Sequence, residues 1–292
     1  MANRLLASKS LHCLLLFSVG LLAGEARALN FCSSAVNRAV AWNEAAADWV
    51  IQTVGSTPSE VAGSGGNCAA VVGNRVWTYR RTTASWTQSS QTIPSASGVV
   101  GSDGNFAAIT GSTVWAYDQA TDTWTQSGSI SGLGSVIAAG GNFAALGSDR
   151  MSVWGRAGGP WVVSPVFGSG YETLAAGGNF AARNGDDVWA WRRSTATWLQ
   201  QSVSSLVEWA AAAGNFAAIG SSSFAVFDDL AGAWSVETGL STLSGLTGSD
   251  ASFGAQTGSE FVIWDAGTGV FTDTSGSPSG GSALVGSRSN FG

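Results

Sequence analysis

One short motif recurs through almost the whole chain at nearly constant intervals. In full form it reads Asn-Phe-Ala-Ala, and full or weaker copies start at residues 30, 67, 105, 142, 179, 215 and 252. Successive copies are therefore 36 to 38 residues apart. A period of this length indicates one repeated supersecondary unit that stacks on its neighbours to bury an apolar face. The repeat thus determines what residues 29–292 can fold into.

Two further positions of the repeat are aromatic in all seven units. The first column contains Trp42, Tyr79, Tyr117, Trp154, Trp191, Phe227 and Trp264. The second column lies seven residues later and contains Trp49, Trp86, Trp124, Trp161, Trp198, Trp234 and Phe271. Only 10% of the chain is aromatic, so these columns do not arise by chance. Large rings fill the space of about 10 Å between facing sheets, and we interpret both columns as core between units.

Each unit contains four short segments of strand-like sequence separated by turn residues. In the third unit they span residues 106–110, 114–117, 123–126 and 135–139. Even spacing of short strands with one aromatic set per unit predicts an all-β fold, a seven-bladed β-propeller with four-stranded blades. Residues 29–292 start at the second strand of a blade, and residues 281–288 match a first strand. We therefore expect a C-terminal strand to complete the N-terminal blade.

The segment from Tyr117 to Trp124 resembles a kelch repeat. It runs from a Tyr and an Asp, through a Thr, to a Trp seven residues after the Tyr, and Asp228 and Asp265 repeat the Asp position. The resemblance covers all seven units and implies a propeller fold. The units depart from the kelch pattern because they are shorter and usually carry one Gly where kelch repeats carry two. The activity of the copper oxidase in that family is not expected here, since its copper ligands include His.

The first 28 residues have the layout of a secretory signal peptide. Arg4 and Lys9 precede an apolar run at residues 11–22, and Ala26-Arg27-Ala28 is a small-x-small cleavage site. The apolar run is too short for a comfortable membrane span. We expect cleavage after Ala28 and a secreted or periplasmic protein without a membrane span.

Removal of this leader leaves an acidic chain with restricted chemistry. The whole chain has 13 Lys plus Arg and 19 Asp plus Glu; without Arg4, Lys9, Arg27 and Glu25, 10 Arg and 18 carboxylates remain, a net charge of −8. Neither Lys nor His remains, which excludes imidazole metal sites, Ser-His-Asp triads and Schiff-base chemistry. An acidic chain without a basic cluster is a poor nucleic-acid binder. We expect no cofactor, no metal site and no catalytic residue.

Two cysteines, Cys32 and Cys68, remain after the leader is removed. They occupy adjacent positions in neighbouring units, and an exported protein meets an oxidising compartment. A disulfide between the first two blades is geometrically permitted. The alternative is a pair of small buried thiols.

The candidate binding residues fall outside the repeating pattern. On the face formed by the loops between blades and the loops between second and third strands, these are Arg75, Arg150, Tyr171, Glu172, Asp186, Asp187, Glu208 and Trp209. They suggest a polar ligand site around a central channel; the alternative is a solvated rim. An acid/base pair from the carboxylates at 186, 187 and 208 is a weaker hypothesis.

A third column, two residues before the first aromatic column, is less uniform. It is Trp in three units, Trp77, Trp115 and Trp189, and is Ser, Ala or Val in the others. Exposed Trp rings here would stack on sugars. The alternative is that they cover the outer part of each blade.

The leading functional hypothesis is a non-enzymatic exported binding module that recognises a glycan or a protein surface through one propeller face. A carboxylate- and Arg-based polysaccharide lyase or hydrolase is one alternative. A purely architectural protein of an envelope or matrix is another. We expect the protein to be a monomer.

Overall fold

The computed structural model describes residues 31–156, 159–258, 260–273, 286–287 and 290–291. Every regular element within these ranges is a β-strand, which confirms the all-β prediction. No membrane-spanning helix occurs among the described residues. The predicted signal peptide and the first repeat start at residue 30 lie outside them.

The strands form seven successive antiparallel sheets, which we number as blades one to seven. Blades one to four contain β1 (Cys32–Ala35), β2 (Arg38–Asn43), β3 (Asp48–Thr53); β4 (Glu60–Ser64), β5 (Asn67–Val72), β6 (Arg75–Arg80), β7 (Ser85–Gln88); β8 (Gly98–Ser102), β9 (Asn105–Thr110), β10 (Thr113–Asp118), β11 (Thr123–Gln126); β12 (Ser135–Ala139), β13 (Asn142–Leu146), β14 (Met151–Trp154), β15 (Val162–Val163). Blades five to seven contain β16 (Glu172–Ala176), β17 (Asn179–Asn184), β18 (Asp187–Arg192), β19 (Thr197–Ser202); β20 (Glu208–Ala212), β21 (Asn215–Ile219), β22 (Ser223–Asp228), β23 (Ala233–Thr238); β24 (Leu243–Ser249), β25 (Ser252–Thr257), β26 (Glu260–Asp265), β27 (Val270–Asp273).

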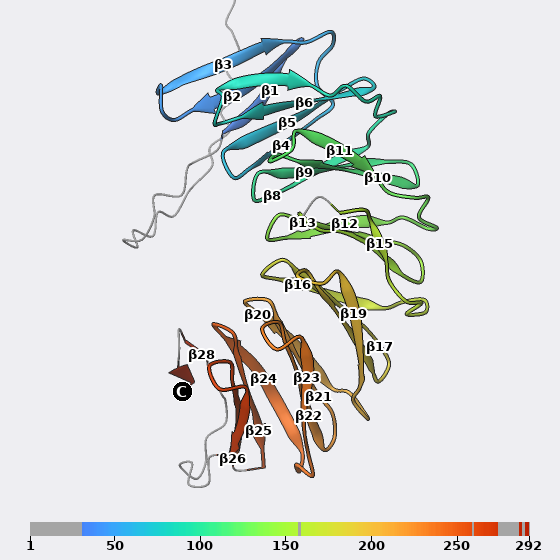
Figure 1. Cartoon of the computed structure of the whole chain (residues 1–292), viewed down its shortest axis with the longest axis vertical. Coiled ribbons are helices and arrows are strands. Elements are labelled where there is room, and N and C mark those ends of the chain that lie inside the picture. The colour runs from blue at the N-terminus through green and yellow to red at the C-terminus, as the bar shows by residue number, and fades with distance from the viewer. Residues whose placement is uncertain (1–30, 157–158, 259, 274–285, 288–289, 292) are drawn as a thin grey trace, which may run out of the picture.

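The blades follow one another along an arc, with the first strands β4, β8, β12, β16, β20 and β24 on its inner side (Figure 1). Within each blade the strands form a simple meander, and the register pairs the two aromatic columns directly, as in Tyr117 opposite Trp124. The sequence prediction of seven blades is therefore confirmed. Blades two to seven are four-stranded, whereas blade one has three strands.

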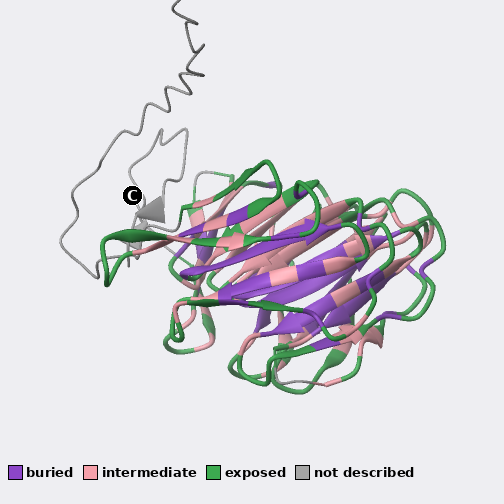
Figure 2. Ribbon diagram, turned by 90° about the horizontal axis from the view of Figure 1, so that it is seen from above, coloured by how far each residue is buried: buried purple, intermediate pink, exposed green. Residues whose placement is uncertain are grey.

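The blades stack through two different faces. We call the face that carries the Phe of the motif and both aromatic columns the front face, and the opposite one the back face. In the contact between blades two and three, Val71 and Val76 of the back face pack against Phe106, Tyr117 and Trp124 of the front face. The other five contacts follow the same front-to-back rule. Buried residues consequently run through the middle strands, and exposed residues gather in the loops (Figure 2).

The tight turns between first and second strands carry a pair of glycines in several blades at the point where neighbouring blades touch. Gly140 and Gly141 have φ of 51° and 82°, which suits a hairpin turn and is strained for other residues. A Cβ on Gly140 would lie 2.8 Å from the Cα of Gly178 in the next blade's turn. The turns of neighbouring blades are therefore already in contact.

The Asn that opens each motif joins three segments. Asn142 is 2% exposed; its Nδ2 donates to the Gly178 carbonyl of the next blade (2.6 Å), and its Oδ1 accepts from the Arg156 backbone N–H (2.6 Å). The same pair of bonds occurs at Asn67, Asn105, Asn179 and Asn215. In blade seven Ser252 takes this position and accepts one backbone bond, from Ala266 (3.0 Å). We call this series the Asn ladder.

A disulfide joins Cys32 of β1 to Cys68 of β5, with Cα atoms 5.8 Å apart. It links the front face of blade two to blade one at the position where the other front faces carry the motif Phe. The structure thus selects the disulfide over the two free thiols that the sequence left open.

The predicted completion of blade one by a C-terminal strand falls mostly outside the described residues, because only 286–287 of the segment 281–288 are described. Among the described C-terminal residues, β28 (Gly286–Ser287) pairs with β29 (Asn290–Phe291), and β1 has β2 as its sheet neighbour. β28 lies against β24 of blade seven (Figure 1). A hairpin between near neighbours in sequence closes a far shorter loop than a pairing between the two ends of the chain, and its entropic cost is smaller.

Candidate functional site

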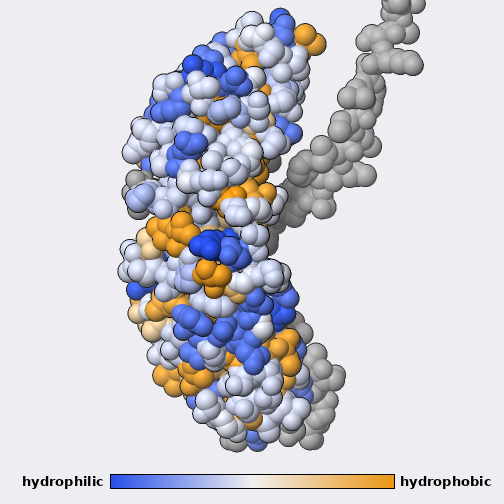
Figure 3. Space-filling model, turned by 90° about the vertical axis from the view of Figure 1, so that its right-hand side faces the viewer, coloured by the Kyte–Doolittle hydropathy of each residue, from blue (hydrophilic) through white to orange (hydrophobic). Residues whose placement is uncertain are grey.

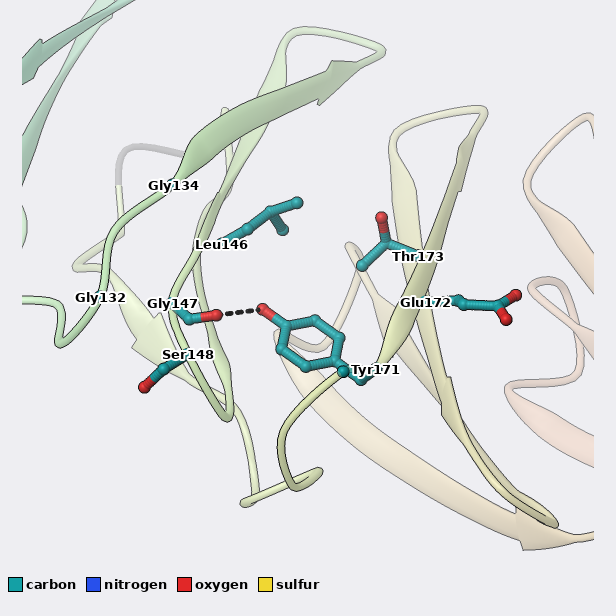
Figure 4. A pocket seen from close by; sticks show the side chains of 9 residues that line it. Gly132, Gly134, Leu146, Gly147, Ser148, Tyr171, Glu172 and Thr173 are labelled. Carbon is teal, nitrogen blue, oxygen red and sulfur yellow. Dashed lines mark hydrogen bonds between the residues drawn. The ribbon is translucent and has the colours of Figure 1, made fainter.

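One hollow that involves predicted binding residues lies between blades four and five. Its volume is about 570 Å³, and it is lined by Gly132, Gly134, Leu146, Gly147, Ser148, Gly170, Tyr171, Glu172 and Thr173. These residues precede β12, follow β13 and lead into β16, so that two blades each contribute loop residues (Figure 4). Glycine makes up much of the lining, and the N–H groups of Gly134 and Gly147 donate to the carbonyl oxygens of Leu146 (3.0 Å) and Arg150 (2.9 Å).

Tyr171 forms a fixed wall of this hollow. Its hydroxyl donates to the carbonyl oxygens of Gly147 (3.1 Å) and Arg150 (2.9 Å), and its ring packs on Phe167 with centroids 5.2 Å apart. Burial, together with the nearby charge of Asp149, raises the pKa of Tyr171 to about 12. The phenol therefore stays protonated at neutral pH and acts as a positioned donor.

A charged and aromatic group spans blades five and six beside the hollow. Arg183 approaches both carboxylate oxygens of Glu172 at 2.9 Å, and the Trp209 indole N–H donates to Glu172 Oε2 at 3.2 Å. The Arg183 guanidinium also lies over the Trp209 ring, 5.6 Å from its centroid. The Glu172 side chain is 55% exposed, so the pair contributes little to stability but presents its remaining donors and acceptors to solvent.

Two smaller hollows continue the first one. One, of about 240 Å³, shares Gly170 and Glu172 with it and extends past Arg183 to Asp186 and Leu206. The other, of about 410 Å³, shares Ser148 and extends past Arg150 to Val163. The three form a continuous polar depression over the loops of blades four to six, which we call the loop groove.

The predicted carboxylates mostly serve the loops themselves. Glu208 accepts the backbone N–H groups of Gly245 (3.0 Å) and Leu246 (2.8 Å) in blade seven. Asp186 accepts from the Leu206 N–H (3.1 Å), and Asp187 accepts from the Ser202 hydroxyl. These three carboxylates therefore have backbone or hydroxyl groups of the loops and strand ends as partners.

The two remaining predicted arginines have different surroundings. Arg150 forms a two-bond pair with Asp149, both bonds being 3.0 Å, and lines the loop groove. Arg75 donates to the carbonyls of Ser89 (3.0 Å) and Ser90 (2.6 Å) in blade two, away from the residues that line the groove. The structure therefore brings together the predicted residues of blades four to six and leaves Arg75 apart.

The hypothesis of exposed Trp platforms is not supported by the packing. Trp189 is 5% exposed and lies 4.9 Å from Phe167 between ring centroids. Trp77 and Trp115 are half-buried in the contacts with the preceding blades. The physical reason is that this column lies on the front face, which each blade turns toward its neighbour. The half-buried indole at the loop groove is that of Trp209.

Arg183 is the site residue that sequence reasoning missed. It occupies the fifth position of the motif, where other units have Val71, Ile109, Leu146 and Ile219. The available signal was a charged residue in a column that is apolar in four other units and carries the uncharged Ser34 and Gln256 in the remaining two. Among the described residues, no group of three or more His, Cys, Asp or Glu is placed to bind a metal ion.

The ionisation of Glu172 is expected to depend on Arg183. Hydrogen bonds from Arg183 hold the pKa of Glu172 below its ordinary value, so the ion pair persists while the pH falls through the usual carboxyl range and is lost only below it. In the Arg183→Gln variant, the titration midpoint of Glu172 should rise toward the ordinary value of a glutamate carboxyl. A ¹³C NMR titration of the side-chain carboxyl measures this, and an unchanged midpoint would contradict the assignment.

Comparison with known proteins assigns the chain to no family. No family model and no curated protein matches the chain. Hsv2 of Kluyveromyces lactis is similar in structure at 11% identity and TM-score 0.34, over 72% of this chain and 74% of that one. Kluyveromyces marxianus Hsv2 gives 11% identity and TM-score 0.34 over 72% and 73%. A chain of the mitotic checkpoint complex gives 15% and 0.32 over 80% and 87%. Likeness at this level does not extend to function.

Proposed function

We propose that the protein is a non-enzymatic, exported binding module whose loop groove takes up a glycan. The observation that carries the proposal is the group formed by Glu172, Arg183 and Trp209. A planar Arg–carboxylate pair offers directed donors and acceptors for sugar hydroxyls, and an adjacent indole offers an apolar surface. The hollow beside it, about 570 Å³, has the size of ordinary small-ligand sites.

Export is part of the same proposal. The leader at residues 1–28 supports secretion or a periplasmic location, with cleavage after Ala28. The disulfide between Cys32 and Cys68 supports it too, because such bonds persist in oxidising compartments. The aromatic repeat around Tyr117 and Trp124 supports a kelch-like relationship within the propeller class.

A protein surface is the second candidate ligand. Exposed apolar side chains flank the loop groove, with Val163 56% and Val207 55% exposed. On the outer side of the arc, where β15 lies, hydrophobic patches are set among hydrophilic residues (Figure 3). The enzymatic alternative has less support, since Asp186, Asp187 and Glu208 are engaged by loop groups.

Binding should depend on Arg183. With a glycan array as the screen and calorimetry on the best ligand, the Arg183→Ala variant should bind about tenfold or more weakly, because it loses hydrogen bonds from a charged group. Arg81→Ala is the matched control: its side chain is exposed, its backbone N–H bonds to Asn67, and it lies at the opposite end of the strands. Absence of any glycan signal, or equal loss in both variants, would contradict the proposal.

A further inference from the structure

The two ends of the arc expose faces that the other blades bury. At the front face of blade one, Trp49 is 43% exposed, whereas Trp86 and Trp124 in the same column are 9% and 7% exposed. Phe31 is 44% exposed on this face, whereas Phe106 is fully buried at the same repeat position. Blade one therefore presents a front face on which none of the described blades packs.

The back face of blade seven, at the other end of the arc, is also more exposed than the back faces of the internal blades. Ile263 is half-buried there, whereas Ala116, Val153 and Val226 at the same repeat position are 0% exposed. Thr272 is exposed on the outer strand of this face. In the internal contacts the equivalent positions pack against the next blade, as Val50 and Leu199 do.

The hydrogen bonding of the internal contacts shows how the two faces would fit. Three second-column indoles donate to the outer strand of the preceding blade, in the pairs Trp86–Val50 (3.1 Å), Trp161–Thr125 (3.1 Å) and Trp234–Leu199 (3.3 Å). The acceptor is always the backbone carbonyl that stands one residue after the second aromatic column. At the free faces the equivalent groups are the Trp49 indole N–H and the Thr272 carbonyl. These lie in blades at opposite ends of the arc (Figure 1).

We propose that a second copy of this chain covers the front face of blade one with the back face of its blade seven. Such a contact repeats the six internal contacts and leaves them unchanged. Closing the arc within one chain would instead require all six to rotate, although the inner turns already touch: a Cβ on Gly65 would lie 2.5 Å from the Gly104 nitrogen. The proposal does not depend on the function of the loop groove, and it replaces the monomer expected from the sequence.

The contact joins unlike faces, so each added copy leaves one front and one back face free. Assemblies of this kind grow beyond dimers unless the rotation between copies closes a ring. Sedimentation velocity of the mature chain over a range of concentrations should show a mass that rises past two chains. Trp49→Arg and Thr272→Arg should each weaken association about tenfold or more, because each places an unpaired charge at the centre of the contact. Leu230→Arg, at an 86% exposed turn position, is the control and should associate as the wild type does.

Mixing the two variants tests the head-to-tail geometry. Each retains one intact face, so an equimolar mixture should form a complex of two chains and stop there. A wild-type protein with the mass of one chain at every concentration overturns the proposal, as does a mixture that stays monomeric. Association that survives Trp49→Arg also overturns it. Circular dichroism of each variant, expected to match the wild type, shows that lost association is not lost folding.

Discussion

Replacing Asn142 by alanine should destabilise the protein by roughly 2–5 kcal/mol, because two buried groups lose their partners at once. The Gly178 carbonyl accepts a 2.6 Å hydrogen bond from this side chain, and the Arg156 N–H donates a 2.6 Å hydrogen bond to it. Asn142 is 2% exposed, so water cannot easily take its place. Thermal unfolding measured by circular dichroism should show a midpoint lowered by several degrees.

The chain supplies its own graded control for this prediction. Asn142→Ser copies the arrangement in blade seven, where the Ser252 hydroxyl accepts a backbone N–H at 3.0 Å and reaches no further blade. It should therefore lose about half as much stability as the alanine variant. Equal losses in the two variants would show that the backbone bond to Arg156 contributes nothing.

Removal of the disulfide should lower the free energy of unfolding by a similar amount. The bond between Cys32 and Cys68 closes a loop with a sequence separation of 36 residues. In the chain-entropy model a loop of this length stabilises the folded state by roughly 3–4 kcal/mol. The double variant Cys32→Ser, Cys68→Ser should unfold at lower urea concentration than the oxidised wild type.

The reduced wild type separates the covalent effect from the substitutions. If the crosslink is the source of stability, the reduced protein and the double variant should show similar midpoints, both below that of the oxidised protein. Limited proteolysis of the reduced protein, at a dilution where it is monomeric, should cut first in blade one. Three strands of blade one are described, and its front face is exposed in a single chain. A reduced protein as stable as the oxidised one would contradict the prediction.

Most of the blade architecture could be predicted because equivalent positions of the repeat have the same kind of packing environment in each blade. Each aromatic column occupies one position in one kind of contact, so Tyr117 and Trp124 indicate the environment of their counterparts in other blades. The tryptophans at 77, 115 and 189 lie on the same strand face as the first column, and that alone indicates the contact with the preceding blade. Their scatter among units suggests exposure, but Trp189 packs against Phe167 with ring centroids 4.9 Å apart.

The loop groove could be predicted only in part. Residues outside the repeat, such as Tyr171, Glu172 and Trp209, were recognisable as exceptions. Their partners were not, because the contact between Glu172 and Trp209 joins residues 37 apart through the stacking of two blades. The strand expected at residues 281–288 lies mostly outside the described residues. A repeat pattern specifies which segment resembles a first strand, but it does not specify which sheet edge that segment joins.

The Asn ladder gives the array a direction. Each Asn amide reaches forward along the chain, from its own blade to the turn of the blade that follows, as Asn215 does to the Ala251 carbonyl. During synthesis from the N-terminus, a finished blade therefore holds an unsatisfied amide donor until the next hairpin emerges and caps it. The blades would therefore assemble one after another from the N-terminus. A chain whose synthesis stops early would end in a blade whose Asn amide still lacks its acceptor.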